Sequence, residues 1–230
     1  MELNYSSVSQ LIQEAIKNKV TISSLVLNQQ AQQKELSQQE LYKKMLNNYQ
    51  VMKSCITPGC AKDLRSTSGL TGGDAWKMKR SVEKKENLTG SLIGGALYRA
   101  LAVSELNASM GRIVAAPTAG SCGILPAAVL TMEEEKHLSE KQCVMSLFTA
   151  SAIGMVIANN ASLAGARGGC QAECGSASAM AAAAIVELAG GTPEMVGSAV
   201  AIALKNILGL VCDPVAGLVE IPCIKRNASG

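Results

Sequence analysis

Apolar residues recur at helical spacing along most of this 230-residue chain, and short breaks rich in Gly, Pro or polar residues separate the periodic stretches. Near the start, the pattern predicts an amphipathic helix capped by Ser7 or Ser9 and running to Lys19, with one apolar face formed by Leu11, Ile12 and Ile16. A second helix, largely solvated because it is rich in Gln, Glu and Lys, is expected from Leu25 to Tyr49. These helices form either a peripheral hairpin or a lid or partner-binding arm.

Farther along the chain the apolar periodicity becomes stronger. It predicts four long helices, over residues 87–110, 142–158, 174–189 and 194–209. The sequence between the last two, Gly190–Gly191 followed by Thr192 and Pro193, carries the signals of one helix ending and the next beginning. Residues 142–166 carry no charge, but Asn159 and Asn160 interrupt them, so a buried core helix is favoured over a membrane span.

Composition narrows the fold class. The chain is 48% hydrophobic but only 3% aromatic, so Ala, Leu, Ile, Val and Met must build the core. Such small side chains suit closely packed helices better than a β-sandwich, whose strands prefer aromatic and β-branched residues. We therefore expect an all-α, Ala/Gly-rich helical bundle with site-forming loops and broken helices. It is divided into an N-terminal arm over residues 1–54 and a main domain over residues 55–230.

Charge and cysteine usage limit the cellular context. A net charge of +3 without basic runs interleaved with aromatics predicts no nucleic-acid partner, and no membrane partner is expected either. The first residues lack the layout of a signal peptide, which predicts a cytoplasmic protein. Its eight cysteines should then be reduced thiols, most of them packed as small hydrophobic residues.

One polar stretch stands out among the apolar helices. Residues 159–184 read NNASLAGARGGCQAECGSASAMAAAA and include Arg167, Glu173 and a Gly–Gly pair. A helix that only fills a core has no use for these residues, because buried polar groups are costly and Gly disfavours a helix. The stretch therefore predicts a functional site.

Two loops are candidate parts of the same site. In residues 111–130, Pro117 and Gly120 break the chain where Thr118 and Ser121 supply hydroxyls, so the loop either holds a carboxylate at the start of the next helix or is an ordinary capped turn. The other loop, SGLTGGDA at residues 68–75, suits anion binding or a lid, although it matches neither GxGxxG nor a P-loop.

The cysteine spacing excludes the common metal motifs. Cys55 and Cys60 have neither zinc-ribbon spacing nor a second pair, and the close C-x2-C-x2-C run of ferredoxins is absent. Three other cysteines lie in breaks of the chain: Cys170, Cys212 and Cys223. Either they are unconnected thiols, or they converge on one iron–sulfur cluster with one open, Lewis-acidic iron.

Three long blocks make the sequence similar to a known family. PTAGSCGILPAA, ASLAGARGGCQAECGSASAMAAAA and CDPVAGLVEIPCIKRNA resemble the alpha subunit of the iron–sulfur-dependent L-serine dehydratases, or L-serine ammonia-lyases, and SGLTGGDA agrees with them. The resemblance covers roughly residues 60–230. It implies an all-helical protein that holds a [4Fe–4S] cluster through Cys170, Cys212 and Cys223. It also implies that the open iron binds L-serine and helps to expel its β-hydroxyl after loss of the α-proton, so that pyruvate and ammonia form.

The resemblance also frames the remaining site residues. A serine carboxylate would suit Thr118 and Ser121, with Arg167, Lys225 or Arg226 as cationic partners. The only histidine, His137, lies in a charged run and is expected at the surface, so no general base is evident. In the family a beta subunit or fused domain completes the site. We therefore expect this chain to form a hetero-oligomer with that beta subunit and to be poorly active alone. Separately, because more helices normally follow this point in the family, we expect the chain to be a truncated form that stops at NASG.

Other readings stay open. A pyridoxal-phosphate dehydratase would need a Schiff-base lysine and a glycine-rich phosphate cradle, and no such loop occurs. An L-cysteine desulfidase could expel sulfide through the same iron. A cluster-carrying subunit without turnover is the remaining alternative.

Overall fold

The computed structural model describes residues 5–230, and within them it is all-helical, which confirms the expected fold class. A single isolated bridge, Val215 to Leu218, is the only β pairing in this part of the chain. The helices are α1 (Val8–Asn18), α2 (Ile22–Gln33), α3 (Gln38–Ser54), α4 (Ile56–Gly59), α5 (Asp74–Glu83), α6 (Gly90–Ala108), the 3₁₀ turn η1 (Ala119–Ser121), α7 (Ile124–Lys136), α8 (Glu140–Asn160), α9 (Gly165–Gly168), α10 (Cys170–Leu188), α11 (Pro193–Ile207) and α12 (Ile221–Ser229).

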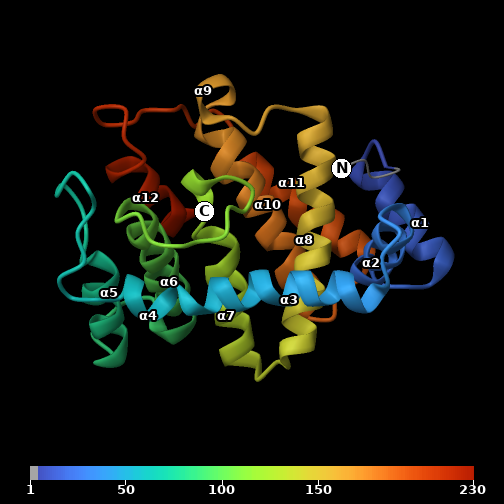
Figure 1. Ribbon diagram of the computed structural model, residues 1–230, viewed down its shortest axis with the longest axis horizontal. Helices are drawn as coiled ribbons and strands as arrows, with labels where there is room; N and C mark the ends of the chain where they lie inside the picture. The colour runs from blue at the N-terminus through green and yellow to red at the C-terminus, as the bar shows by residue number, and fades with distance from the viewer. Residues whose placement is uncertain (1–4) are drawn as a thin grey trace.

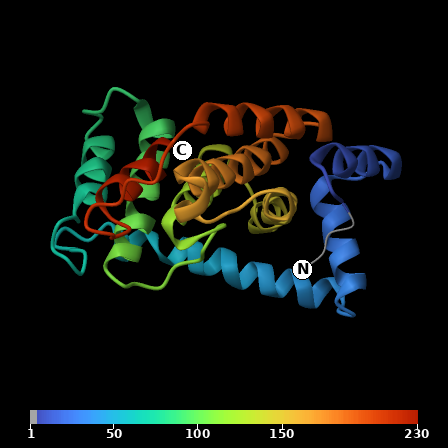
Figure 2. The ribbon, with the colours of Figure 1, turned by 90° about the horizontal axis from the view of Figure 1, so that it is seen from above.

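Helix α10 is the centre of the bundle. It packs against α7, α8 and α11 (Figure 1). Seen from above, α11 covers one side of this group and the long α3 crosses the other (Figure 2). Helices α1 and α2 lie at one end, where they contact α11 and α8, while α5, α6 and α12 form the opposite end. The segments of the predicted site, α9, η1 and α12, all contact α10.

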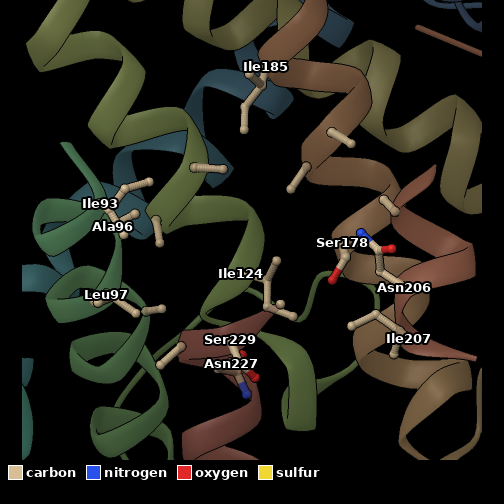
Figure 3. A pocket seen from close by; sticks show the side chains of 18 of the residues that line it. Ile93, Ala96, Leu97, Ile124, Ser178, Ile185, Asn206, Ile207, Asn227 and Ser229 are labelled. Carbon is tan, nitrogen blue, oxygen red and sulfur yellow. The ribbon is translucent and has the colours of Figure 1, made fainter. Parts of the chain in front are cut away.

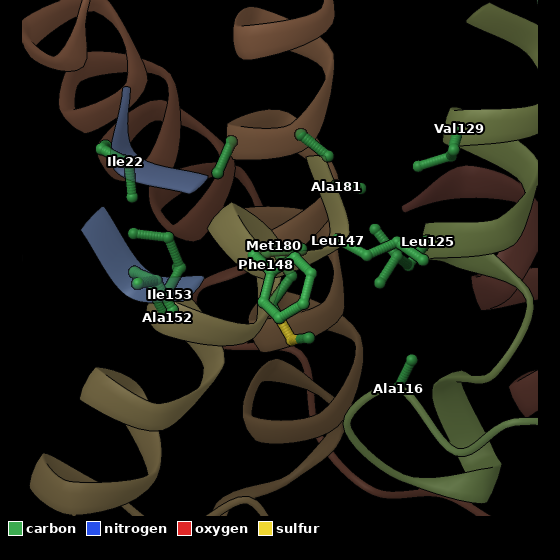
Figure 4. Packing of buried hydrophobic residues seen from close by; sticks show 14 of the residues in the cluster. Ile22, Ala116, Leu125, Val129, Leu147, Phe148, Ala152, Ile153, Met180 and Ala181 are labelled. Atoms are coloured by element: carbon green, nitrogen blue, oxygen red, sulfur yellow. The ribbon is translucent and has the colours of Figure 1, made fainter. Parts of the chain in front are cut away.

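Small residues allow these helices to approach closely. Ala177, Ala183 and Ala184 of α10 are fully buried, and a Cβ at Gly154 of α8 would lie 2.8 Å from the sulfur of Met180. The single phenylalanine, Phe148, is 0% exposed and belongs to the same buried core cluster as Met180 (Figure 4). Interiors are packed to crystal-like density, so this Ala/Gly lining sets the helix spacing.

The N-terminal prediction was right for one helix and wrong for the next. Ser7 caps α1, with its side chain accepting a bond from Gln10 N, as predicted. The expected helix from Leu25 to Tyr49 is instead two helices, α2 and α3. They separate before Ser37, which forms a capping box with Glu40. Because that reciprocal pair satisfies two orphan backbone donors, it starts a new helix inside the polar run.

The uncharged stretch forms α8, a helix long and apolar enough by composition to cross a membrane. Its apolar window is 61% buried inside the protein, against α2, α3, α7 and α10. Burial of this kind is that of a core helix. Local signals farther on were also read correctly: Thr192 caps α11 and Pro193 is its first residue.

Candidate functional site

The start of α10 is shaped by an unusual glycine. Gly169 adopts φ +77°, and a Cβ there would lie 2.6 Å from the carbonyl oxygen of Leu210. Both the backbone angle and the close approach require glycine. This contact lets Gln171 N donate to Leu210 O at 3.0 Å, and it brings the backbone of Cys212 beside the first turn of α10. Cys170 and Cys212 thus come together from segments forty residues apart in sequence.

Arg226 of α12 ties the third segment to the first two. Its Nη1 donates to Cys170 Sγ at 3.1 Å and to Val211 O at 3.0 Å, and its two nitrogens form a bidentate pair with Asp213. The Arg226 side chain is 15% exposed. Cys223 lies on the same short helix, one turn earlier, so the bonds of Arg226 also hold the helix that carries this thiol beside the first turn of α10.

The pKa of Cys223 depends on burial and on the neighbouring thiols. Burial, followed by the charges of Cys170, Glu173 and Cys212, raises the pKa of Cys223 to about 11, while Arg226 acts in the opposite direction. Burial, with Cys170 next in effect, raises the pKa of Cys174 to about 12. The Cys223 thiolate is therefore unfavourable here unless a cation neutralises it, and a metal centre would supply such a charge.

The three candidate ligands differ in exposure: Cys170 is buried, Cys223 is half-buried and Cys212 is exposed. Within residues 5–230 no three His, Cys, Asp or Glu side chains lie close enough to hold one metal ion. Thiolates are the ligands that iron–sulfur clusters take, so these residues have the chemistry to hold one.

The loop before α7 faces the same first turn of α10. It contains the cis Ala116–Pro117 peptide and the η1 turn. Thr118 Oγ1 donates to Glu173 Oε1 at 2.8 Å, and Ser121 Oγ lies 3.1 Å from Thr118 Oγ1. The loop hydroxyls predicted from the sequence are thus brought to Glu173, a carboxylate of the polar stretch to which the sequence had given no particular role.

Asn227 locks this loop onto α12. Its Oδ1 accepts from Gly123 N at 2.8 Å, and its Nδ2 donates to Gly120 O at 2.7 Å and Cys223 O at 2.9 Å. The amide is buried, and all three of its bonds are good. The N–H of Gly123, just before α7, is therefore bonded within the protein.

The three predicted cationic residues have different surroundings. Arg226 is held as described above. Lys225, half exposed, forms an ion pair with Asp74 of the 68–75 loop. Arg167 is exposed in α9, and no ion pair within residues 5–230 includes it. His137 is exposed at the end of α7, as expected.

The glycine-rich 68–75 loop binds an anion, but that anion belongs to the chain. Buried Glu105 of α6 accepts from Gly73 N at 3.1 Å, Asp74 N at 2.9 Å and Ala75 N at 3.2 Å. The same loop bonds to the carboxylate of Glu220 just before α12, through Ser68 at 2.7 Å and Thr71 at 3.2 Å. The loop is therefore a brace between α5, α6 and α12, which positions Cys223.

A separate cavity lies on the other side of α12. It has a volume of about 540 Å³ and is lined mostly by apolar side chains of α6, α7, α10 and α11, together with the end of α12; its polar side chains are Ser178, Asn206, Asn227 and Ser229 (Figure 3). None of the cysteines lines it. It is distinct from the thiol site, although Asn227 contributes to both.

Fold and site together define an all-helical protein that gathers cysteine thiols, a carboxylate and an arginine at the start of one central helix. The model of the family described as "Serine dehydratase alpha chain" matches residues 17–230, and the chain belongs to this family.

Similar proteins are also named as serine dehydratases. The chain is 48% identical over 226 residues to a probable L-serine dehydratase alpha chain of Bacillus subtilis, covering 98% of this chain and 75% of that protein. It is 42% identical to the L-serine dehydratase alpha chain of Peptoniphilus asaccharolyticus, covering 92% and 72%. An L-serine dehydratase of Streptomyces coelicolor is 40% identical, and there the match covers 95% of this chain but 48% of the relative.

Proposed function

We propose that this chain is the alpha component of an L-serine ammonia-lyase, which converts L-serine to pyruvate and ammonia. The observation that supports the proposal is that Arg226, on the same helix as Cys223, bonds to Cys170 and to the segment of Cys212 in a member of the serine dehydratase alpha chain family. The proposed catalytic domain is residues 55–230. Residues 1–54 are the proposed arm.

The proposed cofactor is a [4Fe–4S] cluster held by these three cysteines. Thiolates are the ligands that such clusters take, and three of them leave one iron for substrate. When bound, the cluster supplies a Lewis acid that stabilises departing hydroxide, a poor leaving group. Arg226 donates to Cys170 and to the 211–213 segment, so it links two of the three proposed ligand segments.

The remaining residues bind and orient the amino acid. The proposed substrate-binding set from the sequence is Thr118, Ser121, Arg167, Lys225 and Arg226. Among its cations, Arg226 and Lys225 are already paired with Asp213 and Asp74. Arg167 is therefore the proposed partner of the substrate carboxylate, because guanidinium binds carboxylates well and this one is exposed beside the site.

The base that removes the α-proton is proposed to come from a partner. His137 lies at the end of α7, whereas the thiols lie around the first turn of α10. A beta subunit or beta domain, in a cytoplasmic hetero-oligomer, would complete the site, and several relatives extend beyond the matched region.

The experiment is anaerobic reconstitution with iron and sulfide, followed by spectroscopy with and without L-serine and by a pyruvate assay with the beta component. The expected result is a cluster spectrum that L-serine perturbs, and pyruvate that forms only when both components are present. A reconstituted cluster that ignores L-serine would contradict the proposal. Strong turnover by the chain alone would contradict the proposal that a beta component supplies the base.

A further inference from the structure

The hydrogen bonds around Thr118 have a fixed direction. A carboxylate only accepts, so Thr118 must give its single hydroxyl proton to Glu173 Oε1 at 2.8 Å. Ser121 Oγ lies 3.1 Å from Thr118 Oγ1, and it must then donate its proton to that hydroxyl oxygen. The chain of donors runs from Ser121 through Thr118 to Glu173 and ends in a carboxylate. Both hydroxyl protons are used, so what this corner presents to a ligand is lone pairs and negative charge.

Two glycines, Gly120 and Gly165, leave room for the carboxylate of Glu173. A Cβ at Gly120 would lie 3.2 Å from both oxygens of Glu173, and a Cβ at Gly165 would lie 2.5 Å from Oε2. Neither glycine has a positive φ. Backbone conformation therefore does not require them, and the space that they leave is occupied by the carboxylate itself.

Glu173 also lacks an internal counter-ion. The ion pairs formed within residues 5–230 do not include it. It lies beside the thiol site, because it is in the first turn of α10, the helix that begins at Cys170. A half-buried carboxylate next to a cluster of thiols, with no cation of its own, matches a ligand that brings a positive charge.

We propose that Glu173, Thr118 and Ser121 form the subsite for the α-ammonium group of an amino-acid substrate, with Glu173 as its counter-ion. This inference rests on the proposed function and specifies it. The loop hydroxyls bind the ammonium end of the substrate, and the carboxylate end lies toward Arg167 on α9, the short helix that also carries Gly165. The site thereby selects amino acids over hydroxy acids of the same size.

The test compares two ligands that differ at one group. L-serine and 3-hydroxypropionate share the carboxylate and the β-hydroxyl, but only serine has the ammonium. Binding of each to the anaerobically reconstituted full chain is measured by titration of the cluster spectrum and by calorimetry. The wild type should bind L-serine more tightly. Glu173→Gln should weaken L-serine binding about tenfold or more, because a charged hydrogen bond is lost, and should leave 3-hydroxypropionate within about twofold.

Two further variants keep the result interpretable. Gly120→Ala retains the carboxylate but crowds it, and should selectively weaken L-serine binding even if Glu173→Gln fails to fold. Glu135→Gln, at an exposed glutamate of α7, is the matched control and should change neither affinity. Equal losses for both ligands, or unchanged discrimination in Glu173→Gln and Gly120→Ala, would overturn this inference alone. Failure of the wild type to bind either ligand would overturn it together with the proposed function.

Discussion

Arg226 donates a hydrogen bond to the sulfur of Cys170 at 3.1 Å, across 56 positions of sequence. The same guanidinium holds Val211 O and Asp213 beside Cys212. One side chain of α12 therefore fixes the first turn of α10 and the 208–219 segment relative to Cys223.

Replacing Arg226 should loosen this arrangement. Arg226→Met removes donors to a thiol, a carbonyl and a carboxylate, and we expect a loss of about 1–3 kcal/mol in unfolding free energy together with lower iron content after reconstitution. Urea denaturation and iron analysis measure the two effects. Lys225→Met is the control on the same helix. It breaks a half-exposed ion pair with Asp74 and should cost less than about 1 kcal/mol without loss of iron. Equal behaviour of the two variants would contradict the role given to Arg226.

Gly169 should be intolerant of any side chain. Gly169→Ala combines a positive φ with a Cβ 2.6 Å from Leu210 O, so the start of α10 must separate from the segment that carries Cys212. The matched control is Gly190→Ala, where φ is +80° but the added Cβ meets nothing within 4 Å. The control should cost about 1–2 kcal/mol from backbone strain alone and keep its iron. Gly169→Ala should cost clearly more and bind less iron, and comparable stability and iron content in the two would refute the close contact.

The contribution of Glu105 to the free energy of unfolding is expected to increase as the pH falls. Burial raises the pKa of this carboxyl, although the N–H groups of Ala75, Asp74 and Gly73 partly offset it. A group whose folded pKa exceeds its unfolded value binds its proton more tightly in the folded state. Its contribution to stability therefore grows as pH falls through the folded pKa and shrinks as pH rises. Asp74, whose pKa is lowered first by its bond from Lys225, acts in the opposite direction.

The variant Glu105→Gln isolates this effect, because glutamine does not titrate. Denaturation of both proteins at pH 7 and at pH 5 should show the wild type gaining stability relative to the variant at the lower pH. A difference that stays constant, or that moves in favour of the variant at pH 5, would contradict a raised pKa at Glu105.

Sequence reasoning succeeded where the signals are local. Ser7 and Thr192 were recognised as caps because a hydroxyl before an apolar helical stretch satisfies an exposed backbone N–H. The same kind of signal was overlooked at Ser37, where the capping box with Glu40 divides the polar run into two helices. Periodicity alone does not locate such a break, because both halves keep a helical pattern.

Relations between distant segments were less accessible. The glycine-rich 68–75 loop was read correctly as anion-binding, but nothing in its letters identifies Glu105, thirty residues away, as the anion. Glu173 was noticed as an unexpected polar residue, and only the approach of Thr118 shows which partner it has. The choice of cysteines came from family resemblance rather than from spacing, since each lies in a different segment.

The central claim, that three distant cysteines hold one cluster, is tested most directly by metal analysis of single substitutions. Cys170→Ala, Cys212→Ala and Cys223→Ala are reconstituted anaerobically beside Cys143→Ala, which removes a fully buried thiol from α8. The account predicts that each of the three loses most of its iron and sulfide, while Cys143→Ala retains wild-type content. Normal iron and sulfide in any one of the three would remove that cysteine from the ligand set, and normal content in all three would contradict the account.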